Sequence, residues 1–387
     1  MRVGPKSDPL LLMPMYEDVY DFQNLLAAYQ KAIKYKRYKR NIVYFSFYLE
    51  NNLFKLRREL LSERYLPSTY VCFTIYHPKI RKIAAPSFRD RVLQHSLFSR
   101  IRFLFESKFI YDSYACRRDI GTHFAMRRTK KFLQAARSKY GKDRPIYCLR
   151  MDIKKYFSSI SWDILLSIID KTITCEKTKK LIEKVVTQHS CANARSQPIS
   201  PPPDVVNPLS RQGVPIGNLT SQLFANIYLN ELDHYIKEVL CLKWYGRYMD
   251  DFMVIHPDKD YLKKIKIKIE IFLDQHLHLQ LHPKKVIIQN VNTGIPFVGY
   301  RIFYDHVLVR GKTLLRIRQK LKAKRMEYKT NQESDRLRAA YSSIRGHLVH
   351  ANTYGLQRNL FLRPFPKSGI IFVYEKNNNP RASNSCC

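Results

Sequence analysis

The sequence lacks any apolar run long enough to cross a membrane, because no stretch reaches the roughly 18 residues that a spanning helix needs. The apolar residues 10–13 end at Pro14 and are too few for the core of a signal peptide. The eight cysteines form no C-x-x-C pair and no cluster with histidine at zinc-binding spacing. We therefore expect a cytoplasmic protein with reduced thiols, no zinc site and no membrane association.

Acidic residues are scarce relative to basic ones. The chain carries 32 Asp and Glu against 68 Lys and Arg, which gives a formal net charge of +36 and a pI near 9.9. A surface this positive attracts polyanions and releases their counterions on binding. Nucleic acid is the first expected partner; an anionic membrane surface is the second candidate, and the lack of a long apolar run disfavours it. The 387 residues allow two or three domains or one large multi-lobed enzyme.

Two segments concentrate the positive charge. Residues 16–66 mix aromatic, apolar and basic positions, as in 35–40, Tyr-Lys-Arg-Tyr-Lys-Arg. This pattern predicts helices with one apolar and one basic face; the aromatic rings suit base stacking, and a merely solvated face is the alternative. Residues 312–350 hold a second basic helical stretch.

The middle of the chain predicts a sheet covered by helices. Residues 146–153 alternate with period two and predict a strand. A helix follows, for which Thr220 or Ser221 is the candidate cap, and then a hairpin over 243–255. A helix over 258–275, capped by the aspartate at its start, completes the order, which favours an α+β fold with helices on one face of the sheet.

The tetrapeptide 248–251, Tyr-Met-Asp-Asp, lies between two strand-forming segments. Adjacent carboxylates repel and raise each other's pKa, a cost that a multivalent cation removes. A magnesium site for phosphoryl transfer is the functional interpretation, and an acidic solvated turn is the alternative.

Asp152 supplies a third carboxylate from another segment. Nucleotidyl transfer needs charge stabilised on the attacking and leaving oxygens, which two metal ions about 3.5–4 Å apart achieve. Asp152 at the end of the predicted strand and Asp250 in the hairpin suit that pair of ions. The contribution of the adjacent Asp251 to binding the ions is less certain. The alternative for Asp152 alone is a strand-terminating or capping residue.

Two motifs that follow each other along the chain resemble those of a known family. Residues 151–157, Met-Asp-Ile-Lys-Lys-Tyr-Phe, and 248–251 resemble the catalytic motifs of reverse transcriptases. Residues 213–222 read Gly-Val-Pro-Ile-Gly-Asn-Leu-Thr-Ser-Gln, where most reverse transcriptases carry Pro-Gln-Gly. The Ile form resembles diversity-generating retroelement enzymes, a bacterial and phage type similar to group II intron reverse transcriptases. Further similarity extends over residues 80–360, in the segments 81–86, 88–92, 113–117, 281–285, 297–300 and 346–354.

The resemblance implies a catalytic set. Asp152, Asp250 and Asp251 are expected to be catalytic and, together with Ile153, to bind two Mg²⁺ ions, or Mn²⁺ in their place. Lys285 is expected to protonate the departing pyrophosphate, and a structural lysine is the alternative.

The resemblance also implies residues that bind the nucleotide and the primer. They are Phe157, Arg81, Arg117, Ile216, Gly217 and Gln222 for the dNTP, and Gly299 and Tyr300 for the primer grip. In the family, an aromatic at the position of Phe157 clashes with a 2′-hydroxyl, so deoxynucleotides are expected; a core phenylalanine is the alternative. Gly213 and Gly217 let the backbone pass close to the template–dNTP pair.

Arg81 and Arg117 are candidates for the triphosphate, because guanidinium groups clamp phosphate bidentately. Solvated arginines are the alternative. The chain departs from the family at Ile120, where relatives commonly carry a basic residue. This departure leaves open which side chain of the loop meets the triphosphate, and Arg118 is close enough to substitute.

Ile216 bears on fidelity. A glutamine there donates and accepts hydrogen bonds beside the nascent pair, whereas isoleucine does neither. Loss of this contact predicts weaker discrimination against mispairs. The resemblance alone adds that errors gather at template adenines, and a packing-only role is the alternative.

The resemblance implies a right-hand polymerase. Its expected parts are N-terminal helices and fingers over 1–145, an antiparallel palm over 146–305, a basic helical thumb over 306–362 and a disordered tail over 363–387. Because the resemblance stops near residue 360, we expect no RNase H, maturase or endonuclease domain. Expected partners are template RNA, a DNA or RNA primer, dNTPs and a small basic accessory protein that forms a pentamer.

The expected activity is RNA-directed DNA synthesis from a retroelement RNA, in the cytoplasm of a bacterium or a phage-infected host. One alternative is a retron or antiviral-defence reverse transcriptase, although the Val-Thr-Gly expected of a retron thumb is absent from the sequence. Another is a catalytically silent RNA-binding protein. The three carboxylates disfavour the silent binder, because a pure binder gains nothing from them in a basic cleft.

Overall fold

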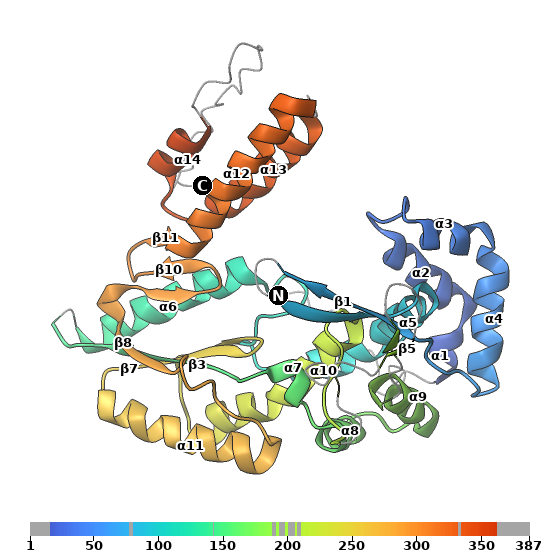
Figure 1. Cartoon of the computed structure of the whole chain (residues 1–387). Coiled ribbons are helices and arrows are strands. Elements are labelled where there is room, and N and C mark those ends of the chain that lie inside the picture. The colour runs from blue at the N-terminus through green and yellow to red at the C-terminus, as the bar shows by residue number, and fades with distance from the viewer. Residues whose placement is uncertain are drawn as a thin grey trace, which may run out of the picture. The chain divides into compact units, whose positions relative to one another are not determined.

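The computed structural model (Figure 1) describes residues 16–76, 80–141, 143–187, 191–192, 198–199, 206, 210–331 and 334–361. The chain forms two compact units, Met1–His306 and Val307–Cys387. No helix within the described ranges is long and apolar enough to cross a membrane. The predicted tail over 363–387 lies outside these ranges.

Five helices pack together near the N-terminus of the first unit: α1 (Tyr16–Tyr20), α2 (Phe22–Ile33), α3 (Arg40–Phe47), α4 (Leu49–Leu61) and α5 (Phe88–Glu106). The other four all contact α5. Leu25, Leu53 and Leu97 are fully buried on their inner faces. The Asp21 carboxylate accepts a hydrogen bond from the Asn24 N–H and caps α2. The predicted helices with an apolar face are confirmed.

A small sheet follows these helices. Strands β1 (Tyr70–Ile75) and β2 (Arg81–Ala85) pair antiparallel. β1 also pairs in parallel with β4 (Cys191–Ala192), which in turn pairs with β5 (Pro198–Ile199). The long helix α6 (Thr122–Tyr140) leads from this region to the central sheet.

The central sheet has four antiparallel strands in the order β6-β7-β3-β8. They are β3 (Tyr147–Asp152), β6 (Tyr245–Tyr248), β7 (Asp251–His256) and β8 (Ile287–Asn290). The predicted strand over 146–153 and the predicted hairpin are confirmed. Leu149 and Met151 of β3 belong to one core with Phe252 and Val254, their partners on β7. The opposite face is buried as well, since Cys148 and Met253 are fully buried there.

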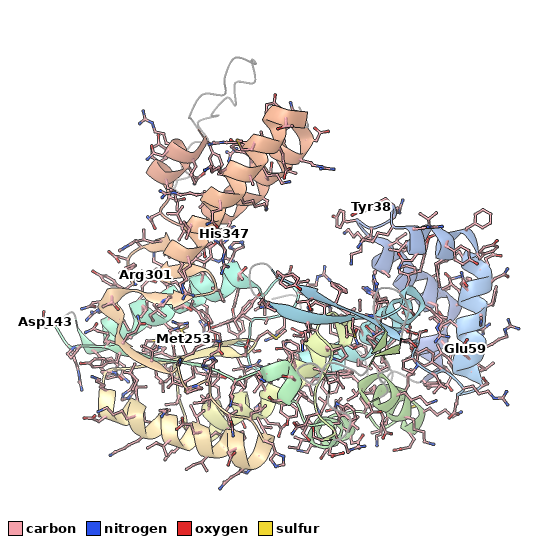
Figure 2. The ribbon with its side chains drawn as sticks, in the orientation of Figure 1. Tyr38, Glu59, Asp143, Met253, Arg301 and His347 are labelled. Atoms are coloured by element: carbon pink, nitrogen blue, oxygen red, sulfur yellow. The ribbon has the colours of Figure 1, made fainter. Side chains whose placement is uncertain are left out.

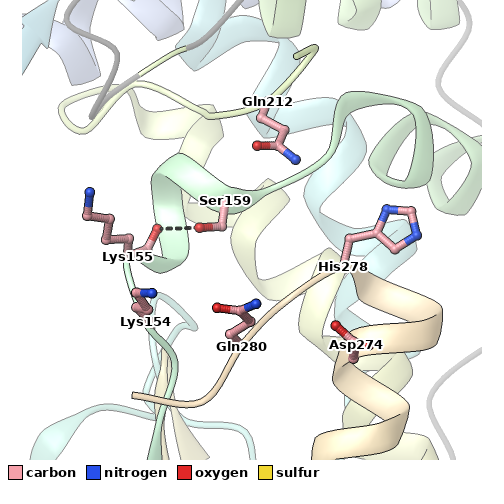
Figure 3. Close-up of a pocket in the computed structure, with 7 residues that line it drawn as sticks. All are labelled: Lys154, Lys155, Ser159, Gln212, Asp274, His278 and Gln280. Atoms are coloured by element: carbon pink, nitrogen blue, oxygen red, sulfur yellow. Dashed lines mark hydrogen bonds between the residues drawn. The ribbon is translucent and has the colours of Figure 1, made fainter. Parts of the chain in front are cut away.

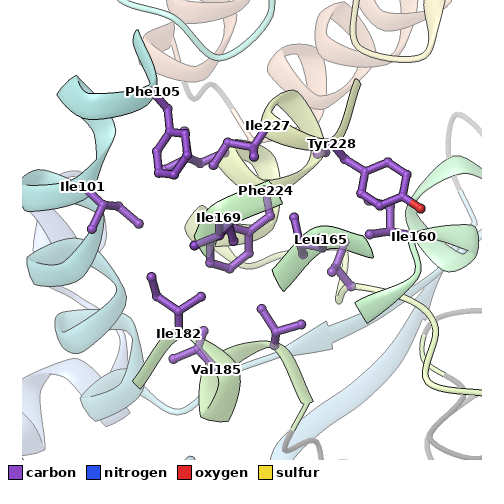
Figure 4. Close-up of a cluster of buried hydrophobic side chains, with 14 of the residues drawn as sticks. Ile101, Phe105, Ile160, Leu165, Ile169, Ile182, Val185, Phe224, Ile227 and Tyr228 are labelled. Atoms are coloured by element: carbon purple, nitrogen blue, oxygen red, sulfur yellow. The ribbon is translucent and has the colours of Figure 1, made fainter. Parts of the chain in front are cut away.

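Helices cover the face of the sheet that carries Leu149 and Met151. They are α7 (Tyr156–Ser159), α8 (Trp162–Asp170), α9 (Glu176–Thr187), α10 (Leu219–His234), the π-helix η2 (Tyr235–Val239) and α11 (Lys259–Leu277). Figure 4 shows how α5, α8, α9 and α10 meet in one cluster, where Phe105, Ile169 and Phe224 converge. In Figure 1, α6 lies across the sheet from α11 and contacts β6 and β7.

The N-terminal ends of α10 and α11 test the predicted helix caps. The Asp258 carboxylate accepts hydrogen bonds from two backbone N–H groups of α11, so the predicted cap is confirmed. Thr220 and Ser221 are not caps, because α10 begins at Leu219 with Asn218 at the cap position. Asn218 makes no capping bond: its Oδ1 is buried without a hydrogen-bond partner, and its Nδ2 donates to the Tyr70 hydroxyl at 2.9 Å.

The first unit ends with a short 3₁₀ helix, η3 (Val291–Thr293), and a hairpin of β9 (Ile295–Phe297) and β10 (Tyr300–Ile302). The second unit contains β11 (Val307–Val309), α12 (Gly311–Asn331), α13 (Ser334–Leu348) and α14 (Tyr354–Phe361). The predicted basic stretch over 312–350 is thus two helices. Their core includes Leu321, Leu337 and Ile344.

Candidate functional site

The three predicted carboxylates meet at one end of the central sheet. Asp152, the last residue of β3, pairs with Asp251, the first residue of β7. The Ile153 N–H donates a hydrogen bond to the Asp250 carbonyl at 3.2 Å. Met249 and Asp250 form the turn between β6 and β7, and Met249 has a left-handed backbone with φ of +53°. The structure therefore brings together residues that lie about 100 positions apart in the sequence.

The carboxylates are electrostatically crowded. Burial raises the pKa of Asp250, and the charge of Asp152 raises it further while Lys285 opposes the shift. Burial raises the pKa of Asp251 to about 6, although Arg150 acts against it, and both neighbouring aspartates add to the rise. The positive charges of Lys285 and Arg150 therefore do not fully offset the three carboxylates. A divalent cation would supply the additional positive charge that keeps them ionised.

Two side-chain cations touch these carboxylates. The Lys285 ammonium donates to Asp152 Oδ1 at 2.6 Å, and one Arg150 Nη lies 3.5 Å from Asp251 Oδ2. Within the described part of the chain, no three His, Cys, Asp or Glu side chains are grouped to hold one metal ion. The donors are nevertheless carboxylate oxygens, which Mg²⁺ prefers, so an ion at Asp152 would compete with Lys285 for Oδ1.

The predicted nucleotide-binding turn lies against both α7 and β2. The Val214 N–H donates to the Phe157 carbonyl at 2.9 Å, which fixes the start of the turn to α7. Gly213 and Gly217 have φ of +96° and +129°, in the range that favours glycine. A Cβ on Gly217 would lie 3.2 Å from the Ala84 carbonyl oxygen of β2. The turn therefore depends on glycine for a close backbone approach.

Ile216 and Gln222 occupy different surroundings near this turn. Ile216 is half-buried in it, and its side chain offers no hydrogen bond. Gln222 is exposed on the first turn of α10, where its Oε1 accepts a hydrogen bond from Cys116 Sγ at 3.3 Å. The loop over 113–117 and the start of α10 thus meet at Gln222.

The two arginines that are predicted to bind the triphosphate differ in exposure and in hydrogen bonding. Arg81 is the exposed first residue of β2, and its charge lowers the pKa of Asp250, so it acts on the catalytic end of the sheet. Arg117 is only 7% exposed. Its guanidinium donates to Glu106 Oε1 at 2.7 Å and to two backbone carbonyls. These bonds engage its Nε and Nη1, whereas the neighbouring Arg118 is 80% exposed.

The predicted primer grip lies between β9 and β10. Val298 and Gly299 form a turn with positive φ values of +44° and +92°. The Tyr300 ring is fully buried, and its hydroxyl lies 3.2 Å from His123 Nδ1. The buried Tyr300 side chain is therefore unavailable to a primer, and a primer grip here would use the backbone of the turn.

A buried ion pair behind the turn at Met249 and Asp250 is absent from the sequence-based predictions. Arg247 of β6 and Asp233 of α10 are both fully buried and bond through two nitrogen–oxygen pairs. Arg247 also donates to the Met249 carbonyl at 3.2 Å and to Ser113 Oγ at 3.0 Å. The Tyr245 hydroxyl donates to Asp233 Oδ1 at 2.6 Å. The available signal was an arginine in an otherwise buried strand, directly before the tetrapeptide 248–251.

A polar cavity of about 380 Å³ lies just beyond Asp152 (Figure 3). The Lys154 N–H donates to the Gln280 carbonyl at 2.8 Å and ties its two sides together. Its lining carries both signs of charge, with Lys154 and Lys155 on one side and Asp274 near His278 on the other, so the cavity favours neither a cation nor an anion. Its lining consists of Lys154, Lys155, Ser159, Gln212, Asp274, His278 and Gln280.

Comparison with known proteins gives consistent matches. The pattern of the family described as "Reverse transcriptase (RNA-dependent DNA polymerase)" matches residues 77–302. Protein YkfC of Escherichia coli K12 is 26% identical over 281 residues, which cover 64% of this chain and 70% of YkfC. The group II intron-encoded protein LtrA of Lactococcus lactis subsp. cremoris is 21% identical over 286 residues, which cover 58% of this chain and 44% of LtrA. The chain thus spans less than half of LtrA.

Among solved structures, apo telomerase from Candida tropicalis, truncated from the C-terminal domain, aligns with a TM-score of 0.47 and 16% identity. The alignment covers 62% of this chain and 55% of that one. The family match spans more than half of the 387 residues and includes the three carboxylates and the turn over 213–222. The chain therefore belongs to the reverse transcriptase family and has its right-hand polymerase fold.

Proposed function

We propose that this chain is a catalytically active RNA-directed DNA polymerase. The pairing of Asp152 with Asp251 beside the Asp250 turn carries the proposal. Three half-buried carboxylates at one sheet end are costly to maintain unless they serve a cation. A protein that only binds nucleic acid gains nothing from them.

The site residues then take distinct roles. Asp152, Asp250, Asp251 and the backbone of Ile153 would hold two Mg²⁺ or Mn²⁺ ions, which when bound stabilise charge on the attacking and leaving oxygens. The Lys285 ammonium lies 2.6 Å from Asp152 Oδ1. This position suits a proton donor to the departing pyrophosphate.

The nucleotide-binding residues support deoxynucleotide use and low fidelity. Phe157 is half-buried in α7. It occupies the position where the resembling enzymes carry an aromatic ring that clashes with a 2′-hydroxyl. Arg81 and the exposed Arg118 are the candidate triphosphate contacts. Ile216 leaves the nascent pair without a side-chain hydrogen bond, which supports error-prone copying, concentrated at template adenines in the resembling enzymes.

We place the enzyme in a diversity-generating retroelement. The support is the Ile-Gly-Asn form of residues 216–218, together with similarity to LtrA, a group II intron-encoded protein. The proposed partners are template RNA, a DNA or RNA primer, dNTPs and a small basic pentameric accessory protein.

Primer extension tests the activity. Wild-type protein and the Asp250→Asn variant are given a defined RNA template, an annealed DNA primer, dNTPs and Mg²⁺, and the products are sequenced. Extension by the wild type alone, with errors gathered opposite template adenines, is the expected result. Asp250→Asn keeps the size of the side chain, so loss of extension reports on charge rather than packing.

Other outcomes separate the alternatives. Faithful extension would leave a reverse transcriptase but remove the mutagenic role, as for a retron or defence enzyme. Equal extension by both proteins would rule out catalysis by these carboxylates. Absence of extension even with cognate RNA and the accessory protein would favour a silent RNA-binding protein.

A further inference from the structure

The N-terminal helices carry unusually exposed aromatic rings. Tyr35, Tyr38, Tyr44 and Phe47 are 85%, 81%, 69% and 79% exposed. Aromatic side chains normally bury most of their surface, because each ring removes a large apolar area from water. Four such rings within thirteen residues therefore indicate a binding surface rather than scattered apolar residues.

The same segment is strongly and uniformly basic. Residues 22–49 contain no Asp or Glu. The Lys34 ammonium lies 5.3 Å from the centre of the Tyr35 ring, so charge and ring are adjacent in space. The basic residues of the segment are Lys31, Lys34, Lys36, Arg37, Lys39 and Arg40. A ligand of this surface must therefore be anionic.

Helix α3 is anchored firmly enough to fix this outer face. Ile42 and Phe45 are buried on its inner side, and Phe45 packs edge-on against Phe88 of α5 with ring centres 4.9 Å apart. The Tyr29 hydroxyl donates to Ser46 Oγ at 2.7 Å. Because the inner face is held, the rings on the outer face stay turned to solvent.

The outer face is shaped as well as charged. Residues of α3 line a shallow hollow of about 650 Å³. The Phe47 ring meets the Tyr48 ring edge-on at 4.9 Å, which adds an aromatic wall. Figure 2 shows Tyr38 projecting outward from the turn that precedes α3. The lining residues are Arg40, Asn41, Val43, Tyr44 and Phe47.

We propose that this α3 surface, made of Tyr35, Tyr38, Tyr44, Phe47 and the basic residues 34–40, binds single-stranded RNA. Exposed rings bind unpaired bases by stacking, while neighbouring basic side chains hold the phosphates. Duplex RNA offers no free base faces to the rings. A protein partner is disfavoured, because protein interfaces are depleted in lysine and these cations have no carboxylate within the segment.

The surface is distinct from the catalytic site. In Figure 1, α3 lies at the end of the first unit away from β3 and β7. RNA binding there requires no catalysis, so this inference goes beyond the proposed polymerase activity and does not depend on it. It gives the enzyme a second contact with an unpaired part of its RNA.

The affinity of the protein for a labelled single-stranded RNA tests the inference. An unlabelled primer–template hairpin is added so that it occupies the catalytic cleft. The variant combines Tyr35→Ser, Tyr38→Ser and Tyr44→Ser, all at exposed positions. Each lost ring is expected to weaken binding by roughly fivefold or more. Primer extension on the short hairpin is expected to stay at the wild-type rate, which separates this result from failure of the polymerase proposal.

Two further variants sharpen the test. Leu61→Ser with Leu66→Ser removes exposed apolar side chains that are 58% and 59% exposed but do not stack, and is expected to bind normally. The second variant combines Lys36→Gln, Arg37→Gln and Lys39→Gln. It is expected to reduce the slope of log Kd against log salt concentration by about 2, or roughly 0.7 for each lost phosphate contact.

Photocrosslinking of 4-thiouridine RNA to the full-length wild type locates the contact directly, and adducts within residues 34–48 are expected. Unchanged affinity of the tyrosine variant, or adducts only elsewhere, would overturn the inference. So would a wild type that self-associates through this face, seen as a dimer by sedimentation that the variant cannot form while RNA affinity is retained.

Discussion

Arg247 and Asp233 form a fully buried ion pair behind the turn that carries Asp250, with Nε–Oδ1 and Nη2–Oδ2 distances of 2.7 and 2.6 Å. The same guanidinium donates to the Met249 carbonyl. Met249 adopts a left-handed backbone, which costs a non-glycine residue about 1–3 kcal/mol. We interpret the pair as the support that holds the turn, and with it Asp250, against this cost.

The first prediction separates stability from positioning. Arg247→Met leaves the Asp233 carboxylate buried and unpaired, so we expect a loss of about 3–5 kcal/mol in the free energy of unfolding. Adding Asp233→Leu removes both charges and is expected to restore most of that loss. Primer extension by the double variant is still expected to be at least tenfold slower, because the Met249 carbonyl has lost its donor. Urea denaturation and extension rates measure the two effects.

Tyr245→Phe is the matched control for this prediction. It removes the hydroxyl that donates to Asp233 and is expected to cost about 1 kcal/mol, but leaves the Arg247 contact to the turn intact. Its extension rate is expected to be unchanged. A double variant that extends primers as fast as the wild type would show that the pair serves stability alone.

The sequence indicated the local features of the site and missed the long-range ones. Period-two alternation located β3, and an adjacent acidic pair located the turn, because both depend on neighbouring residues. The engagement of Arg117 by Glu106 and the burial of Tyr300 depend on partners from other elements. Such partners are set by tertiary packing, which residue spacing does not encode.

The second prediction concerns pH. The pKa of Asp251 is raised to about 6 in the folded protein, above its value of about 3.9 in the unfolded chain. Its contribution to metal-free stability is therefore full below about pH 4 and lost as the pH rises through 6. We expect the difference in unfolding free energy between wild type and Asp251→Asn to change across this window. A constant difference from pH 4 to 7 would contradict the raised pKa.

The third prediction concerns fidelity. Ile216→Gln introduces a side chain that donates and accepts hydrogen bonds beside the nascent pair, so we expect severalfold fewer errors opposite template adenines. Ile216→Leu keeps the apolar character and is expected to keep the wild-type error spectrum. Sequencing of primer-extension products on one RNA template compares the three proteins. Identical spectra for the glutamine and leucine variants would limit Ile216 to packing.

The fourth prediction uses a matched pair of glycines. A methyl group on Gly217 would meet the Ala84 carbonyl oxygen at 3.2 Å, and its φ of +129° disfavours any side chain. We expect Gly217→Ala to cost about 1–3 kcal/mol of stability and to raise the KM for dNTPs, because the turn over 213–222 must move away from β2. Gly355→Ala is the control, since Gly355 lies in α14, has open space around it and has no positive φ. Thermal melts and steady-state kinetics compare the variants, and equal effects at both glycines would mean that the close approach of the turn to β2 is not required.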